Sequence, residues 1–238
     1  MKRVFTLLFV LSAFVSCDIL QELPGATTTT TGAGGVTQAE AAQGIREALG
    51  QGLAKAVTQI NTTDGFFSTA YKILLPPEAQ KIEKTLRSLG MNQLVDKAIL
   101  QINRGAEDAA GFAKPIFVDA IKGMTLTDAI NIIRGSDTSA TNYFRVRTSQ
   151  KLTAAFSPVI KSSLDKVSAT RYYGDMINTY NSFPTTATKL NPDLQSYVTL
   201  RATNALFDLI SKEEKNIRAN PVARTTEILK KVFGNLGR

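Results

Sequence analysis

The chain has 238 residues, a formal charge of +8, a single cysteine, and neither histidine nor tryptophan. Without histidine it lacks the commonest general base and the commonest metal ligand, which excludes histidine-dependent catalysis and most zinc sites. No phosphate-binding glycine loop and no nucleophile-elbow motif occurs in the sequence.

The first residues of the chain are typical of an export signal. Lys2 and Arg3 form a positive segment, and an apolar run from Val4 to Phe14 follows it. This run is well short of the roughly 20 residues that a membrane-spanning helix needs. The pattern therefore favours a cleaved signal peptide over residues 1–16.

Cys17 ends the segment FVSC, in which a small residue precedes the only cysteine of the chain. The segment resembles a bacterial lipobox, whose cysteine is diacylated and becomes the new N-terminus, although Phe14 replaces the usual leucine. An unpaired thiol is otherwise a liability in an exported protein, so we expect a lipid anchor at Cys17. The alternative is an ordinary signal peptide with an incidental cysteine.

Residues 17–36 are rich in threonine and glycine and contain few apolar side chains. Such a segment cannot bury enough surface to fold, so it is predicted to be a flexible tether. Its mean reach is roughly 25 Å, which would hold the rest of the chain close to a membrane surface.

Residues 37–238 are predicted to form an all-α, single multi-helix domain of packed amphipathic helices. Apolar residues recur at helical spacing, and the alternation typical of strands is almost absent. Thr37 and Glu40 form a capping box, and Thr125 with Asp128 resembles a second one. Further helix starts are expected at Phe66, Asp137, Ser157-Pro158, Asn191-Pro192 and Asn220-Pro221.

The central stretch, residues 99–147, contains an alanine-rich apolar stripe, which predicts close contact between helices. Asn103 and Glu107 lie four residues apart on one helical face, and no local rule explains them. We expect them to form a buried polar cluster with Arg145 or Arg147 that serves structure rather than chemistry.

The run NRGAEDAAGFAKPIFVDAIKGMTLTDAINIIRGSDTSATNYFR resembles the signature of a bacterial family called domain of unknown function 4197. Gly105 stands where that family usually has alanine, and Ser139 and Asn142 interrupt the last part of the signature. The resemblance covers roughly residues 37–235 and implies a helical domain in a secreted or envelope-anchored bacterial protein, with no assigned activity. Three C-terminal segments match as well, namely DLQSYVT (193–199), LFDLISKEEKNIRANP (206–221) and LKKVFG (229–234).

Acidic side chains are the remaining candidates for chemistry, because carboxylates alone can serve glycoside hydrolysis or bind hard cations. A carboxylate-based hydrolase would need two acids such as Glu107 and Asp119 in one cleft. Helix caps and solvated faces account for most of the acids, so we assign no catalytic residue, no metal ligand and no cofactor. The acids of the central stretch are Glu107, Asp108, Asp119, Asp128 and Asp137.

The leading hypothesis is a lipid-anchored protein of the bacterial cell envelope, outside the cytoplasm, that acts as a non-catalytic binding or structural module. Its expected partners are the membrane, through the N-terminal lipid, and an envelope protein or anionic lipid. No nucleic acid is expected, despite the basic charge. The alternative is a carrier of a small apolar or lipid ligand, with a pocket lined by Phe66, Phe67, Tyr143, Phe144, Tyr172 and Tyr173.

Overall fold

A computed structural model describes residues 36–184 and 193–234 of the chain. The predicted all-α fold is confirmed, because the regular structure in these two ranges is helical throughout. Cys17, the predicted signal peptide and the expected helix start at Asn191-Pro192 lie outside the described residues. The helices are α1 (Gln38–Ile60), η1 (Pro77–Ala79), α2 (Gln80–Ser88), α3 (Asn92–Ala110), α4 (Ala113–Lys122), α5 (Leu126–Ile133), α6 (Ser139–Lys166), α7 (Ala169–Asn181), α8 (Leu194–Ala219), η2 (Pro221–Ala223) and α9 (Glu227–Gly234).

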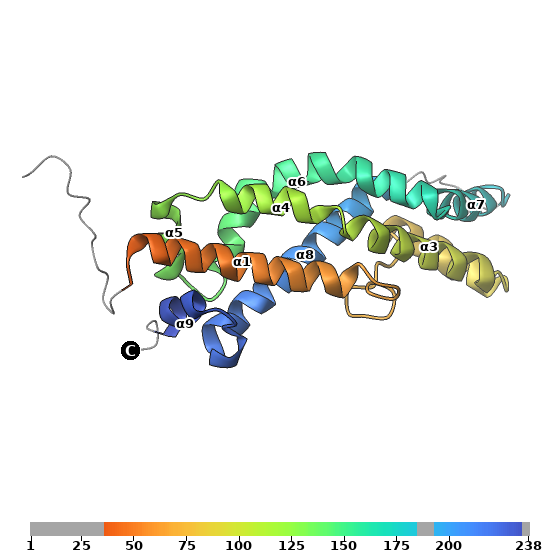
Figure 1. The fold of residues 1–238 in the computed structure, drawn as a ribbon. Helices are drawn as coiled ribbons and strands as arrows, with labels where there is room; N and C mark the ends of the chain where they lie inside the picture. Colours follow the sequence, from red (N-terminus) through yellow and green to blue (C-terminus); the bar gives the residue numbers. More distant parts are fainter. Residues whose placement is uncertain (1–35, 185–192, 235–238) are drawn as a thin grey trace, which may run out of the picture.

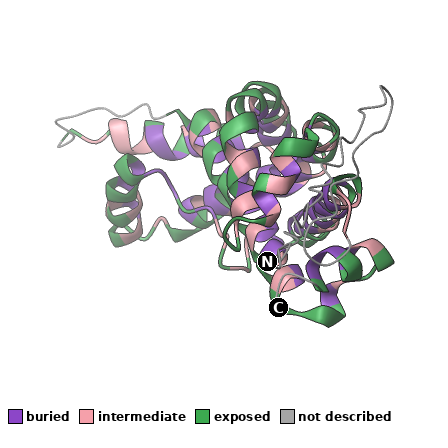
Figure 2. Cartoon of the chain, turned by 90° about the vertical axis from the view of Figure 1, so that its left-hand side faces the viewer, coloured by how far each residue is buried: buried purple, intermediate pink, exposed green. Residues whose placement is uncertain are grey.

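The helices form an elongated body around α8, which contacts α1 along one side and α6 along another. Figure 1 shows α5 and α9 at one end of this body and α3 and α7 at the other. The first turn of α1 lies at the α5–α9 end, so the chain enters the described body there. Seen along its length, the body has its buried residues turned inward between the helices (Figure 2).

The core is closely packed where α8 meets its neighbours. The rings of Phe117 from α4 and Phe207 from α8 meet edge to face, with their centroids 5.4 Å apart. The predicted close approach of helices also occurs at Gly105, since a Cβ there would lie 2.7 Å from Cδ2 and 3.1 Å from Cα of Leu164. Glycine thus lets α3 approach the backbone of α6 more closely than alanine would.

The predicted helix caps are present at the starts of α1 and α5. The Thr37 hydroxyl accepts a hydrogen bond from the Glu40 N–H, and the Glu40 carboxylate accepts one from the Thr37 N–H. Thr125 and Asp128 form the same reciprocal pair at α5, with Asp128 in place of the commoner glutamate.

Three of the expected helix starts are wrong. Residues around Phe66 form successive turns rather than a helix, because they are held by side chains of α3. Asp137 does not cap α6, whose first N–H groups are bound by Glu214 instead. Pro158 lies inside α6 rather than at its start. Pro158 and Ala154 are both exposed, so water can reach the backbone carbonyl that the missing N–H of proline leaves unpaired.

Candidate functional site

Asn103 is completely buried on α3, and its side chain binds a segment that has no regular structure of its own. Its Oδ1 accepts a hydrogen bond from the Ile73 N–H at 2.8 Å, and its Nδ2 donates to the Ile73 carbonyl at 2.9 Å. Nδ2 also donates to the Ile99 carbonyl one turn earlier. One amide therefore satisfies both polar groups of a buried residue, as a neighbouring strand would.

Glu107 lies one turn further along α3 and is also buried. Its Oε1 accepts hydrogen bonds from the N–H groups of Phe66, at 3.0 Å, and Phe67, at 3.1 Å. Its Oε2 lies 2.6 Å from Nη1 of Arg104, and Nη2 of that arginine lies 2.8 Å from Asp64. Both carboxylate oxygens of Glu107 are thus occupied within the protein, which leaves neither free to face a substrate.

The expected partners of this pair, Arg145 and Arg147, lie elsewhere, so this part of the predicted cluster is wrong. Arg145 on α6 donates to Asn204 of α8, and its guanidinium lies 4.6 Å from the ring centre of Phe207. Arg147 is largely exposed, and its nearest carboxylate is Asp128 at 4.0 Å. Arg104 occupies the place expected for them, because it lies one turn before Glu107 on the same helix.

Asp128 belongs to a shallow groove between α5 and α6, which is also lined by Tyr143 and Arg147. The Tyr143 hydroxyl donates to Asp128 at 2.7 Å. Hydrogen bonds from Thr125 and Tyr143 hold the pKa of Asp128 below its usual value. Asp128 therefore serves as a charged helix cap, as the sequence indicated.

A second buried glutamate, Glu214 of α8, was not recognised in the sequence. Its two carboxylate oxygens accept the N–H groups of Ala140 and Thr141 at 3.0 and 2.8 Å, at the start of α6. Arg218, one turn later, forms an ion pair with it at 3.0 Å. A negative charge at a helix N-terminus is favourable, so Glu214 caps α6 from a neighbouring helix.

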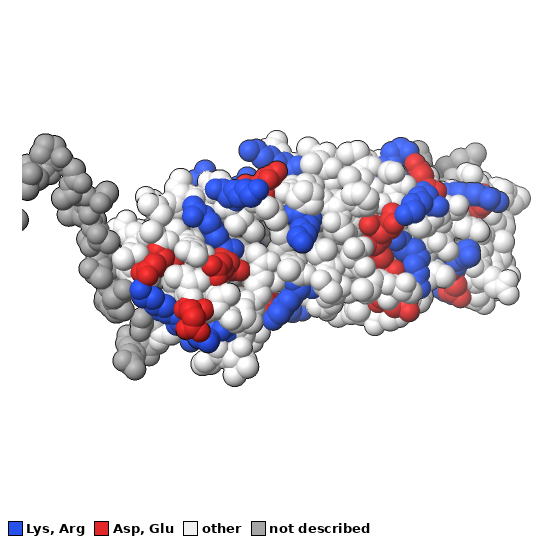
Figure 3. Space-filling model, in the orientation of Figure 1, with Lys and Arg blue, Asp and Glu red and all other residues white. Residues whose placement is uncertain are grey.

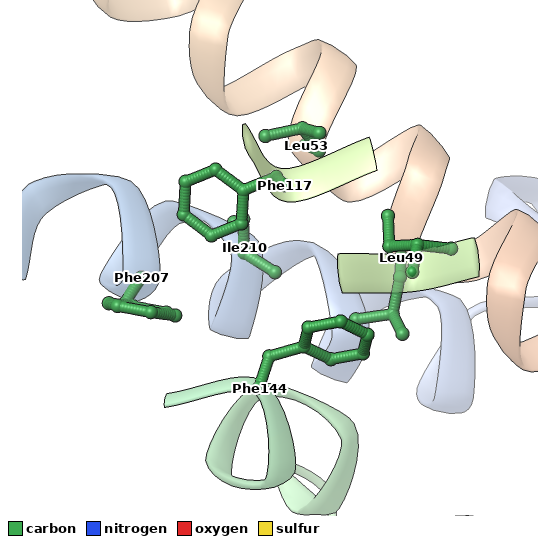
Figure 4. Close-up of a pocket in the computed structure, with 7 residues that line it drawn as sticks. Leu49, Leu53, Phe117, Phe144, Phe207 and Ile210 are labelled. Carbon is green, nitrogen blue, oxygen red and sulfur yellow. The ribbon is translucent and has the colours of Figure 1, made fainter. Parts of the chain in front are cut away.

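The aromatic residues of the carrier hypothesis do not line a common pocket. Phe144 alone among them borders an apolar cavity between α1, α4, α6 and α8, which Figure 4 shows. This cavity has a volume of about 10 Å³, which is the least that a single water molecule needs. Tyr143 lines the α5–α6 groove, and Tyr173 lines a separate hollow between α6, α7 and α8.

The two acids named for a hydrolase differ in their surroundings. Glu107 is buried and fully hydrogen-bonded, whereas Asp119 is exposed on α4. Within residues 36–184 and 193–234, no three acidic side chains gather closely enough to hold a metal ion. In the same part of the chain, each helix is too short or too polar to cross a membrane.

A hollow at the α5–α9 end of the body is lined by three arginines. We call it the arginine pocket and define it by Arg134, Asp137, Arg218, Arg224 and Phe233. Its volume is about 510 Å³, within the range of small-molecule sites. Its arginines come from positions up to 90 residues apart, so no local sequence pattern could have revealed it.

Two of these guanidinium groups are fixed by backbone carbonyls at the helix ends. Arg218 donates from Nη2 to the Ile132 carbonyl at 3.0 Å and from Nε and Nη2 to Glu214. Arg224 donates from Nε to the Ile217 carbonyl at 2.9 Å and from Nη2 to the Arg218 carbonyl at 2.8 Å. In the described part of the chain, Nη1 of each arginine has no hydrogen-bond partner.

These features define an all-helical protein in which buried polar side chains fix irregular segments and helix ends. A family model described as "Protein of unknown function (DUF4197)" matches residues 35–234, so the chain belongs to that family. Comparison with curated proteins and with solved structures gave no match.

Proposed function

We propose that this protein is an envelope-anchored lipoprotein, held by a diacylated Cys17, whose helical body is a non-catalytic binding or structural module. The observation that carries the proposal is that both buried glutamates, Glu107 and Glu214, are saturated by backbone N–H groups and arginines. A carboxylate that acts as an acid, base or nucleophile needs an oxygen directed at its substrate. In this protein the carboxylates of Glu107 and Glu214 instead hold the turns around Phe66 and the start of α6 in place.

The anchoring part of the proposal rests on the sequence around Cys17 and on where the helical body begins. The segment FVSC supplies a lipobox-like site, and the threonine- and glycine-rich run up to residue 36 supplies a tether. The capping box of Thr37 starts α1 directly after that run. A body attached in this way would stay near the membrane while remaining outside it.

The anchor is tested by expressing the complete precursor in a bacterial host supplied with an alkyne-tagged fatty acid. The wild-type chain and a Ser16→Ala variant, which keeps a small residue before the cysteine, are expected to carry the label. The Cys17→Ser variant is expected to lose it, because no other thiol is present in the chain. Equal labelling of Cys17→Ser would show that the anchor is wrong.

The module is tested by chemical cross-linking in intact envelopes. We expect the labelled wild-type chain to form discrete cross-linked species with an envelope component, and the Cys17→Ser chain to form fewer of them. Recovery of the uncross-linked chain alone, at cross-linker levels that capture known neighbouring envelope proteins, would contradict a binding role.

A further inference from the structure

We propose that the arginine pocket binds a phosphate monoanion, and that its natural occupant is the phosphodiester of an anionic phospholipid headgroup. The proposal deepens the function proposed above and rests on it, because only an anchored body is held close to lipid. Planar guanidinium groups suit this ligand, since each can donate two parallel hydrogen bonds to phosphate oxygens.

The pocket is organised before any ligand enters. Arg218 is nine-tenths buried, and its carbonyl and carboxylate partners fix its guanidinium. Arg224 is fixed by two carbonyls at the end of α8. Because these side chains are already ordered, a bound anion would not have to immobilise them.

The charge of the pocket matches a single negative charge. Among the described residues, the lining contributes Arg134, Arg218 and Arg224 against one carboxylate, Asp137, and Glu214 pairs with Arg218 from behind, which leaves one net positive charge. The carbonyls at the ends of α5 and α8 would repel an anion, but those of Ile132, Ile217 and Arg218 are already covered by arginine N–H groups. A phosphodiester, with one negative charge, would neutralise the pocket.

Capping of helix C-termini explains part of this arrangement, because arginines often bind the last carbonyls of a helix. It accounts for Arg218 and Arg224, whose N–H groups reach such carbonyls. It does not account for Arg134, which is exposed at the same pocket and has no ion pair in the described part of the chain. Arg134 is the group that an incoming anion would pair with first.

The position of the pocket agrees with a lipid ligand. It lies at the α5–α9 end, where α1 begins and the predicted tether joins the body (Figure 1). Figure 3 shows basic and acidic side chains interspersed over the visible face, so this face offers no broad basic field to attract a membrane. On this face, attraction of an anionic headgroup would therefore depend on a local site.

The test uses the full chain purified in a non-ionic detergent, with thermal unfolding followed by circular dichroism. Phosphatidylglycerol is titrated into the micelles in one arm and phosphatidylcholine in a second, while a third arm titrates inorganic phosphate at constant ionic strength. The variant is Arg134→Glu, and the matched control is Arg201→Glu, which makes the same charge change at an exposed residue of α8.

Phosphatidylglycerol is expected to raise the unfolding temperature of the wild type and of Arg201→Glu, and phosphatidylcholine to raise it less. Arg134→Glu is expected to need at least about tenfold more phosphatidylglycerol for the same rise. An Arg134-dependent rise with inorganic phosphate as well would support the anion site and identify free phosphate as a sufficient ligand. Equal responses of the two variants, or equal effects of the two lipids, would overturn the proposal.

This titration is independent of the anchor test. A wild-type chain that carries no fatty-acid label would refute the anchored function and leave the response of Arg134→Glu to phosphate unchanged, because the pocket belongs to the folded body. Conversely, a labelled Cys17 together with equal responses of Arg134→Glu and Arg201→Glu would refute anion binding at the pocket and leave the anchored function standing.

Discussion

The side chain of Asn103 hydrogen-bonds both the N–H and the carbonyl of Ile73, a residue 30 positions earlier in the chain. This contact ties the irregular segment before η1 to the middle of α3. The buried asparagine acts here as a substitute for a neighbouring strand, because it supplies a donor and an acceptor to the same residue.

Replacing Asn103 with alanine is expected to lower the free energy of unfolding by about 3 kcal/mol, since the N–H and the carbonyl of Ile73 both lose their buried partner. Urea denaturation measures the change. Asn142→Ala is the control, because that asparagine is exposed on α6 and its loss should cost less than about 0.5 kcal/mol. A similar loss in both variants would contradict the role given to Asn103.

Glu107→Gln is expected to loosen the turns around Phe66 and Phe67 more than the rest of the molecule, because their N–H groups lose a charged acceptor. Hydrogen exchange should therefore become faster at these two amides first. A double-mutant cycle with Arg104→Met should give a coupling energy of about 1–3 kcal/mol, since the two side chains form a close ion pair. Uniformly faster exchange across all helices would argue against a local role.

Glu214→Ala is expected to cost about 3–5 kcal/mol, because it leaves Arg218 buried without its carboxylate and exposes the first N–H groups of α6 to an apolar surrounding. Glu227 of α9 is the control. Its side chain and that of its partner Lys230 are both more than half exposed, so Glu227→Ala should cost no more than about 1 kcal/mol. Chemical denaturation of both variants measures the difference. Equal losses of unfolding free energy would contradict the role of Glu214 as the cap of α6.

The sequence predicted the fold class and the burial of Asn103 and Glu107, because helical spacing reports which face of a helix turns inward. It could not identify their partners, since Ile73 and Phe66 lie 30 and 41 residues away. Glu214 was hidden in the charged run SKEEKNIR, although Ile210 and Ile217 continue the apolar stripe through its position. That stripe is the signal by which Glu214 could have been found.

The arginine pocket illustrates a second limit of sequence reasoning. Arg134 follows α5, Arg218 lies near the end of α8, and Arg224 follows η2. Each position is ordinary for a basic residue, because cations are favourable at helix C-termini. Only the tertiary arrangement brings the three guanidinium groups to one hollow.

The hydroxyl of Tyr173 is buried without a hydrogen-bond partner among the described residues. Burial raises its pKa well above the usual value, and the nearby Glu78 and Tyr197 raise it further. Tyr173→Phe is therefore expected to increase the free energy of unfolding by about 1 kcal/mol at neutral pH, because it removes an unsatisfied polar group.

The gain from Tyr173→Phe is expected to grow above about pH 10, where a tyrosine in the unfolded chain ionises while the folded Tyr173 stays neutral. The raised pKa thus means that the wild type has its full stability below that pH and loses part of it as the pH rises. Urea denaturation at pH 7 and 10.5 measures the effect, with Tyr172→Phe on the half-exposed neighbour as the control. The same pH dependence in both variants would contradict the burial argument.

Gly105→Ala tests the close approach of α3 to α6. A Cβ at this position would lie 2.7 Å from Cδ2 of Leu164 and 3.1 Å from its Cα, so side-chain rotation alone cannot relieve the contact. The clash is expected to cost about 1–3 kcal/mol, partly offset by about 1 kcal/mol of helix propensity, which leaves a net loss of unfolding free energy.

Gly50→Ala in α1 is the matched control for this change, because a Cβ there meets nothing within 4 Å. It should stabilise the protein by up to about 1 kcal/mol, as alanine does within an unobstructed helix. Combining Gly105→Ala with Leu164→Ala should cost less than the sum of the two single changes, since the smaller side chain removes part of the clash. If Gly105→Ala were as stabilising as Gly50→Ala, the α3–α6 contact would not restrict this position.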